Sequence, residues 1–295
     1  MQTTQPDQPT PPNHALPAID FLAIGNVTRD LLPDGGHTLG GTVSYAVMTA
    51  HRLAHRPGAL TRLAPDIPLT GEWNQVIVQR LPSATTTTFR NQYLGQTRRQ
   101  IVSDVAPPIT AHDLPTAWQT VPVTLLGPIA QEVDPSLLAV LRGPIIGAVP
   151  QGWMRQWDAD GVVSRQRWTH AETVLPAISA LILSESDLLQ RQDLAVYRSL
   201  CPTVIVTHGA LGCQVWQHAT MTPVGTRPAV ETDPTGAGDV FATAFLIRLA
   251  ETGHVIQAAR FAAVTASFAV EGSGYSAIPP RTVVEAWLQQ YGETL

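Results

Sequence analysis

A short polar loop that leads directly into an apolar helix constrains this chain more than any other feature. Residues 233–239 are Asp-Pro-Thr-Gly-Ala-Gly-Asp, and 240–245 continue as an apolar stretch. The N-terminus of a helix exposes backbone N–H groups and carries partial positive charge, so this turn suits an anion. Gly236 and Gly238 leave the backbone open to a phosphate, and Asp239 adds a carboxylate. The loop therefore predicts an anion cradle beside a base, as phosphoryl transfer requires, although such a turn can also simply start a helix.

Composition limits the class of protein. The 295 residues are 44% apolar and 14% charged, which favours one large folded core. The net charge is −5 without a basic run, so we expect no nucleic-acid partner. Cys201 and Cys213 lack metal-ligand spacing, and no segment has the pattern of a membrane span or signal peptide. We expect a cytoplasmic protein with a loose tail over residues 1–17 and one domain over 18–295.

Short apolar strands alternate with helical segments along the chain. The first strand is predicted at 18–25, between Pro17 and Gly25. Further strands are expected at 121–127, 143–149, 180–184, 203–207 and 213–217, and helices at 39–56, 134–142, 187–200, 236–251, 254–270 and 280–291. This alternation predicts an α/β fold with a mainly parallel sheet and helices on both faces.

The N-terminal part of the chain supplies a second set of candidate residues. Residues 26–30 follow the first strand, at the carboxyl end where open α/β sheets bind ligands. Gly40 and Gly41 then open a helix, which lets a ligand approach the backbone. Two hairpins are predicted: one at 30–38, whose Pro33, Asp34, Gly35 and Gly36 favour a tight turn, and one at 85–105, which is β-branched and polar with a turn at Gly95. We expect them to form a small sheet over the site, as a lid.

Together these features resemble the ribokinase, or PfkB, family of carbohydrate and nucleoside kinases. The loop at 233–239 matches the C-terminal signature of that family, and residues 26–30 with Gly40-Gly41 match its N-terminal substrate region. Residues 206–212 (Val-Thr-His-Gly-Ala-Leu-Gly) resemble its nucleotide-side strand and turn. The resemblance covers the chain from residue 18. It implies a ribokinase-like α/β fold with a small β-lid, a kinase that uses ATP and Mg²⁺, and a monomer or homodimer.

The resemblance implies a role for each matching residue. Asp239 would be the base that deprotonates the accepting hydroxyl, and the amides of Gly236, Ala237 and Gly238 would hold the transferred phosphoryl group. The remaining implied sites are substrate hydroxyls at Asn26, Asp30, Gly40 and Gly41, the ATP side at Thr207, Gly209 and Gly212, and a monovalent cation such as K⁺ at Asp233 and Thr235 with the 270–276 loop. Turn formation or packing is an alternative role for each of them.

One segment departs from the family pattern. An Asn-x-x-Glu stretch often helps to organise Mg²⁺ through water, and here the corresponding residues are Ser184-Glu-Ser-Asp187. Asp187 keeps the carboxylate on a shorter side chain, and it could equally cap a helix. Because Mg²⁺ is held largely by substrate phosphates and waters, a water-mediated role for Asp187 stays open.

The acceptor is not determined by these motifs. The segments at 25–30, 38–41 and 151–155 (Gln-Gly-Trp-Met-Arg) are most similar to the myo-inositol kinase branch of the family. A small sugar or polyol fits a short lid, whereas a nucleoside needs a stacking aromatic side chain, which Phe89, Tyr93 or Tyr45 could supply.

Two other classes of function compete with a kinase. The same fold could bind a sugar or nucleoside as a catalytically impaired sensor, which the departure at Ser184 and Asp187 would support. A nicotinamide-dependent enzyme would need G-x-G-x-x-G after the first strand. The chain has Gly25-Asn26-Val27 there, so this second class is disfavoured.

Overall fold

A computed structural model of the chain describes residues 16–94 and 97–292. Most of the predicted N-terminal tail and the predicted turn at Gly95 lie outside these residues.

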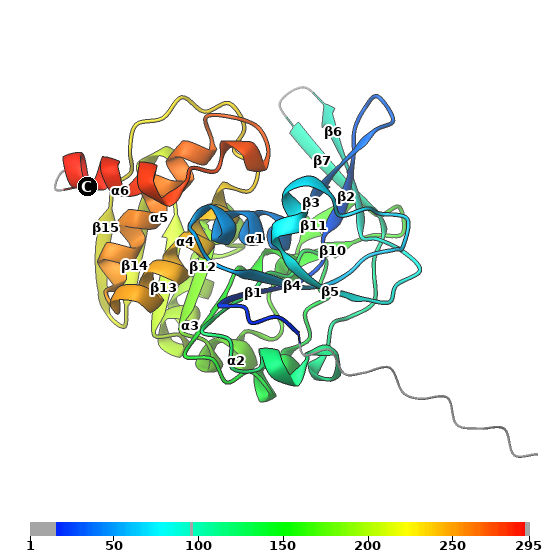
Figure 1. The fold of residues 1–295 in the computed structure, drawn as a ribbon, viewed down its shortest axis with the longest axis horizontal. Helices are drawn as coiled ribbons and strands as arrows, with labels where there is room; N and C mark the ends of the chain where they lie inside the picture. The colour runs from blue at the N-terminus through cyan, green and yellow to red at the C-terminus, as the bar shows by residue number, and fades with distance from the viewer. Residues whose placement is uncertain (1–15, 95–96, 293–295) are drawn as a thin grey trace, which may run out of the picture.

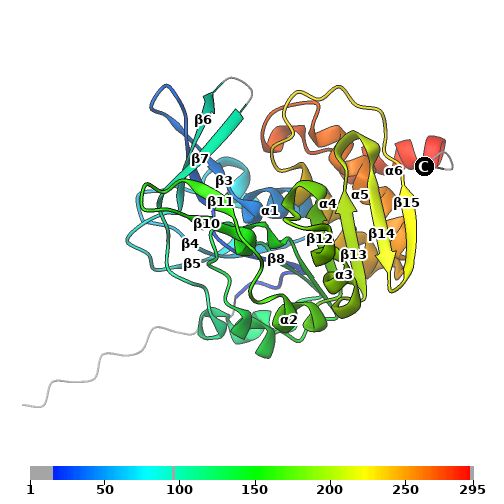
Figure 2. The same cartoon turned by 180° about the vertical axis from the view of Figure 1, so that it is seen from behind.

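The central layer is a nine-stranded sheet (Figures 1 and 2). Its strands are β1 (Phe21–Ile24), β4 (Pro57–Arg62), β5 (Ile77–Leu81), β8 (Val123–Leu126), β9 (Ile145–Ala148), β12 (Ala180–Ser184), β13 (Thr203–Thr207), β14 (Cys213–Gln217) and β15 (Thr220–Val224). They are arranged in the order β15-β14-β13-β12-β9-β8-β1-β4-β5. All neighbours from β13 through β5 pair in parallel, and only β13–β14 and β14–β15 are antiparallel.

Helices cover both faces of this sheet (Figures 1 and 2). One face carries α1 (Thr42–Arg52), α4 (Ala237–Thr252), α5 (Val255–Ala269) and α6 (Arg281–Tyr291), and the other carries α2 (Ala171–Val174) and α3 (Arg191–Leu200). Successive residues of a strand point to opposite faces. Phe21 and Ala23 therefore join the core beneath α1, α4 and α5, whereas Leu22 and Ile24 join the core beneath α2 and α3. The predicted α/β class with a mainly parallel sheet is confirmed.

A four-stranded sheet stands beside the N-terminal end of α1 (Figure 1). It consists of β2 (Thr28–Leu31), β3 (His37–Gly40), β6 (Thr88–Leu94) and β7 (Thr97–Asp104), in the order β3-β2-β6-β7. We call it the lid sheet, after the role expected for its two hairpins. A separate hairpin of β10 (Arg155–Trp157) and β11 (Val163–Arg165) lies against it, and an isolated bridge joins Ile101 to Val162.

Several predicted boundaries were wrong. The helix expected at 134–142 is only a short 3₁₀ turn, η4 (Pro135–Ala139), because the Arg142 amide donates to Gln119 O at 2.7 Å instead of extending a helix. The helix expected from residue 187 begins at Arg191. Helix α1 ends at Arg52 rather than near 56, because Ala54 has a left-handed φ of 65°.

Five strands were not predicted at all: β4, β5, β10, β11 and β15. Strands β4 and β5 come from the stretch between residues 57 and 81, where proline and glycine interrupt the apolar pattern. Strands β10 and β11 have three residues each, too few for a visible alternation.

An ion-pair network joins the ends of α1, α4 and α6. Glu251 accepts hydrogen bonds from Arg281 and from Arg248, the latter at 3.0 Å, and it lies 3.3 Å from Nε2 of His55. Partial burial opposes ionisation of Glu251, but these three partners outweigh it and hold its pKa well below the ordinary range. The network therefore stabilises the fold only while Glu251 is ionised.

We expect Glu251→Gln to lower Tm at neutral pH. We also expect Tm of the variant to change less than Tm of the wild type as the pH falls. A carboxylate with a lowered pKa contributes stability above its unfolded-state value of about 4.5 and loses that contribution as the pH falls further. The difference in Tm between the two proteins should therefore shrink as the pH falls from 7 to 3. Glu285→Gln is the matched control, because Glu285 makes longer contacts of 3.3 and 3.9 Å to the same arginines. Parallel curves for the wild type and Glu251→Gln would contradict the account.

Candidate active site

The loop at 233–239 ends in the first turn of α4. Gly236 is the N-cap residue, with a left-handed φ of 78°, and a Cβ there would lie 2.2 Å from the ring of Tyr45. Only glycine fits this position. The Ala237 amide donates to Pro234 O at 3.1 Å, so it holds the turn together, while a Cβ on Gly238 would meet open space. Of the three predicted anion-hole residues, Gly236 and Gly238 are the better placed to offer their amides to an anion.

A second helix N-terminus faces the first. Gly41 caps α1 with a φ of 86°, and a Cβ there would lie 2.5 Å from Asn26 O. The next residue, Thr42, forms a side-chain hydrogen bond to the carboxylate of Asp239. The N-termini of α1 and α4 therefore meet at Asp239, and both direct partial positive charge toward the same space.

The environment of Asp239 raises the pKa of its carboxyl, which makes it a stronger base. Burial raises the pKa of this carboxyl to about 6, the Thr42 hydrogen bond and the charge of Arg155 act to lower it, and the charge of Asp187 raises it. A carboxylate with a pKa of about 6 is ionised at neutral pH and holds a proton more tightly than an exposed aspartate does. Asp239 can therefore accept a proton at pH 7.

Asp30 lies in the lid sheet, on β2. Its carboxylate accepts a hydrogen bond of 2.9 Å from the Thr28 hydroxyl. Gly40 on β3 pairs directly with Thr28, and a Cβ at Gly40 would lie 2.3 Å from Asp30 Oδ2. Gly40 thus leaves room for the Asp30 carboxylate, which explains why a glycine stands opposite this part of β2.

The side chain of Tyr45 on α1 lies near several of the predicted site residues. Burial raises the pKa of its phenol above the ordinary range, and the neighbouring Tyr275, Asp233, Asp239 and Asp30 raise it further. The rings of Tyr45 and Tyr275 meet edge to face, with centroids 5.1 Å apart. The predicted base and the predicted substrate carboxylate therefore lie around one aromatic side chain on α1.

Asn26 lies behind this region, and its side chain is already engaged. It is fully buried, its Oδ1 accepts from the Arg62 amide at 3.0 Å, and its Nδ2 donates to Thr87 Oγ1 at 3.4 Å. Its backbone N–H donates to Glu132 Oε1 at 2.8 Å. These bonds fix the turn between β1 and β2. The predicted contact of Asn26 with substrate remains a prediction.

Glu132 is a buried carboxylate that the motifs did not reveal. It also accepts from the amides of Ile129 and Ala130, at 3.0 and 2.7 Å. Burial raises the pKa of Glu132, and the three backbone donors act in the opposite direction. Glu132 thus joins the β1–β2 turn to the segment after β8. An isolated acid within the apolar stretch at 128–133 was the available signal.

The predicted donor-side residues lie at the end of β13. Thr207 donates to Leu183 O at 3.4 Å and is half-buried, and Gly209 is exposed in the short turn η8 (Gly209–Leu211). Gly212 is buried with a φ of 85°, and a Cβ there would lie 2.1 Å from Val224 O. Close packing against β15 is enough to explain Gly212, whereas Thr207 and Gly209 face the solvent side.

A chain of polar contacts connects Asp187 to the region of Asp239. Asp187 Oδ2 accepts from the Ser184 amide at 2.9 Å and closes the short turn η7 (Glu185–Asp187) as a capping box. Its Oδ1 accepts from Gln151 Nε2 at 3.4 Å, and Gln151 Oε1 accepts from Arg155 at 2.8 Å. Asp187 is therefore a cap that also contacts Gln151, and its water-mediated role toward Mg²⁺ remains a prediction. Two nearby carboxylates, Asp187 and Asp239, with lone pairs left for water, fit a Mg²⁺ ion held mainly by phosphate.

The expected monovalent-cation region is also brought together. The amides of Thr232 and Asp233 donate to Val270 O at 2.7 and 3.1 Å, and Thr235 N donates to Asp233 Oδ1 at 2.9 Å. The segment at 232–235 thus lies against the end of α5, and the cation site expected there remains a prediction. The described residues contain no group of three or more His, Cys, Asp or Glu side chains with metal-binding geometry.

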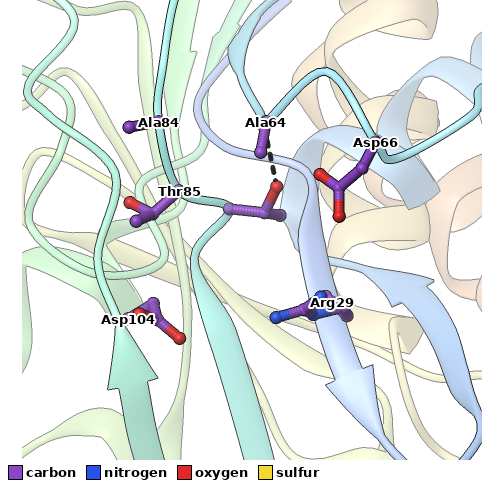
Figure 3. Close-up of a pocket in the computed structure, with 7 residues that line it drawn as sticks. Arg29, Ala64, Asp66, Ala84, Thr85 and Asp104 are labelled. Atoms are coloured by element: carbon purple, nitrogen blue, oxygen red, sulfur yellow. Dashed lines mark hydrogen bonds between the residues drawn. The ribbon is translucent and has the colours of Figure 1, made fainter.

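A separate cavity of about 120 Å³ lies on the other side of the lid sheet. Figure 3 shows Arg29, Asp66 and Asp104 around it, together with Ala64, Ala84 and Thr85, and Thr86 also lines the cavity. Arg29 neighbours Asp30 on β2 and so points to the opposite face. None of the predicted site residues lines this cavity.

Comparison with known proteins tests the family resemblance. The model of the pfkB family of carbohydrate kinases matches residues 156–281, which include the loop at 233–239 and all of α4. The resemblance of this chain to the ribokinase (PfkB) family is confirmed. None of the helices within the described residues is long and apolar enough to cross a membrane.

Two curated proteins to which the chain is similar are kinases. The chain is 26% identical to inositol 3-kinase of Zea mays, over 78% of this chain and 66% of that protein, so it spans less than two thirds of the maize relative. It is 25% identical to cytidine kinase of Thermococcus kodakarensis, over 77% of this chain and 87% of that protein. These matches support a phosphotransferase.

A solved structure confirms the ribokinase fold. A pyrophosphate-dependent kinase in the ribokinase family, complexed with a pyrophosphate analogue and myo-inositol, superposes with a TM-score of 0.75 at 24% identity. The match covers 90% of this chain and 99% of that one.

We expect Glu132→Gln to destabilise the protein by about 2 kcal/mol, because an amide cannot accept from all three backbone donors and its own NH₂ opposes one of them. Urea unfolding followed by circular dichroism would measure the loss. Glu172→Gln, at an exposed glutamate on α2, should leave the midpoint unchanged. A wild-type midpoint for Glu132→Gln would show that the carboxylate does not hold the two turns together.

Proposed function

We propose that this protein transfers the γ-phosphoryl group of ATP to a hydroxyl of a small polyol or sugar, with myo-inositol as the first candidate acceptor. The observation that carries the proposal is the position of Asp239. Its carboxyl lies between two helix N-termini, has a pKa of about 6 and shares its surroundings with Asp30. A proton acceptor within an anion-binding turn is the arrangement that phosphoryl transfer to an alcohol requires.

Each group then has a chemical task. Asp30, beside Gly40, accepts hydrogen bonds from acceptor hydroxyls under the lid sheet. Asp239 takes the proton of the attacking hydroxyl, and the amides of the first turn of α4 stabilise charge on the phosphoryl group. Mg²⁺, which Asp187 would contact through water, would neutralise the donor phosphates. A K⁺ ion would bind at the carbonyls of the segments around Asp233, Thr235 and Val270.

The aromatic side chains favour a polyol or sugar over a nucleoside. Phe89 is buried beneath the guanidinium of Arg155, with 5.5 Å from Cζ to the ring centroid. Tyr45 packs against Tyr275 and Gly236. Both rings are therefore occupied by protein contacts and do not offer a face to a base. The side chain of Tyr93, the third predicted candidate, lies outside the described residues.

Exposed apolar side chains favour a nucleotide as the donor. Leu211, in the same turn as Gly209, is 84% exposed, and Val230, in the segment before the loop at 233–239, is 80% exposed. Apolar groups beside a phosphate site suit a nucleobase, because pyrophosphate has no apolar part. This distinction matters, since a solved structure of the same fold is a pyrophosphate-dependent kinase.

Asp239→Asn tests the base. We expect turnover with ATP, Mg²⁺ and myo-inositol to fall by about two to four orders of magnitude, while ATP binding measured by calorimetry is retained. The assay uses the wild type against a panel of polyols, sugars and nucleosides. Near-normal turnover by Asp239→Asn would contradict the role of base. Ligand-induced melting shifts without turnover in the wild type would support the sensor function instead.

Leu211→Ser tests the donor. We expect the wild type to prefer ATP over pyrophosphate, and we expect the variant to raise KM for ATP by about fivefold with little change in kcat, since about 1 kcal/mol of apolar contact is lost. Steady-state kinetics with each donor in turn measure both values. Faster turnover with pyrophosphate, or no effect of the variant on KM for ATP, would favour a pyrophosphate donor.

A further inference from the structure

Strand β3 forms one edge of the lid sheet, and a side chain from the C-terminal part of the chain contacts that edge. Arg29 on β2 faces Leu39 on β3, but the Arg29 amide donates to Thr87 O at 2.9 Å, on the other side of β2. The two residues therefore form a non-hydrogen-bonded pair, and the Leu39 carbonyl points away from β2. This carbonyl accepts a hydrogen bond from the hydroxyl of Tyr275, the first residue of the short turn η9 (Tyr275–Ala277).

The ring of Tyr275 extends this contact toward the N-terminus of α4. It meets the ring of Tyr45 edge to face, with centroids 5.1 Å apart and an angle of 75° between the ring planes. The Tyr45 ring in turn lies against Gly236, because a Cβ there would be 2.2 Å from it. Successive contacts thus run from β3 through Tyr275 and Tyr45 to the N-cap residue of α4.

The segment that carries Tyr275 is also joined to the loop at 233–239. Val270, the C-cap residue of α5, accepts the amides of Thr232 and Asp233 through its carbonyl oxygen, at 2.7 and 3.1 Å. The segment between α5 and η9 therefore contacts the start of the loop at one end and the lid sheet at the other. It connects the two parts of the protein between which an acceptor and a phosphate would react.

We propose that Tyr275 is a positioning residue that fixes lid strand β3 against the N-terminus of α4. Under the proposed function, on which this role rests, the acceptor binds beside Gly40 at the end of β3 and the phosphoryl group binds at the first turn of α4. Tyr275 contacts the lid side through its hydroxyl and the helix side through its ring. It therefore sets the distance between the acceptor hydroxyl and the phosphoryl group, on which the rate of in-line transfer depends.

Two substitutions separate the two contacts of this side chain. Tyr275→Phe removes the hydrogen bond to Leu39 O and keeps the ring against Tyr45, whereas Tyr275→Leu removes both contacts. Tyr197 on α3 is the matched control. It is buried in the core on the other face of the central sheet, and its ring also meets an aromatic neighbour, Trp168, edge to face, with centroids 5.8 Å apart. Tyr197→Phe and Tyr197→Leu therefore report a general loss of stability.

Hydrogen exchange in the ligand-free protein, followed by NMR, is the first readout and needs no turnover. The amides of Thr38 and Gly40 face β2, so their exchange reports the pairing of β3. We expect Tyr275→Phe to speed their exchange about fivefold, the effect of one net hydrogen bond, and Tyr275→Leu to speed it more. Unchanged exchange of these amides in Tyr275→Phe, or an equal acceleration in the Tyr197 variants, would overturn the inference.

Kinetics with myo-inositol, ATP and Mg²⁺ supply the second readout. We expect Tyr275→Phe to lower kcat by about tenfold and to change KM for ATP by less than about threefold, because alignment is lost while the donor contacts remain. Tyr275→Leu should lower kcat further, and Tyr197→Phe should leave both values unchanged. Faster exchange in β3 with an unchanged kcat would refute the positioning role. No turnover by the wild type would refute the proposed function and this role with it, and exchange would still decide whether Tyr275 holds β3.

Discussion

The carboxylate of Asp239 between two helix N-termini is the interaction on which the rest of the site depends. Burial disfavours its ionised form and raises its pKa. The Thr42 hydrogen bond and the charge of Arg155 favour the ionised form and lower the pKa in part. Because the turn in front of α4 suits an anion as well, the carboxylate and a phosphate compete for the same positive potential. Burial keeps the pKa of Asp239 near 6, above the value of an exposed aspartate.

Close backbone approaches bring the two helices to this point. A Cβ at Gly25 would lie 2.3 Å from Gly127 O, and one at Gly127 would lie 2.4 Å from a carbon of Thr42. The backbones at the ends of β1 and β8 and at the start of α1 therefore lie so close together that Gly25 and Gly127 leave no room for a side chain. Glu132 holds the same ends from behind through three backbone donors. Backbone groups and glycines thus hold the two helix N-termini in place. Few side chains are left there to take part in a reaction.

Local pattern predicted most of the helices and the strands that lead to the site, but long-range contacts were not visible in it. The loop at 233–239 and the Gly40-Gly41 turn carry their signals within a few residues, so both helix N-termini were found. Thr42 and Arg155 act on Asp239 from distant parts of the sequence, and neither was predicted in that role. Pro57 and Gly58 concealed β4, although the strand is well buried against β1. The helix expected at 134–142 was wrong because a tertiary contact, Arg142 to Gln119, outweighs helix propensity.

The most direct test of the account is a crystal structure with myo-inositol and a non-hydrolysable ATP analogue bound together. The account predicts one ring hydroxyl within about 2.6–3.2 Å of an Asp239 carboxylate oxygen. It also predicts the γ-phosphate at the first turn of α4, with Gly236 and Gly238, in line with that hydroxyl. A polyol bound away from Asp239, or a γ-phosphate elsewhere than the N-terminus of α4, would contradict it.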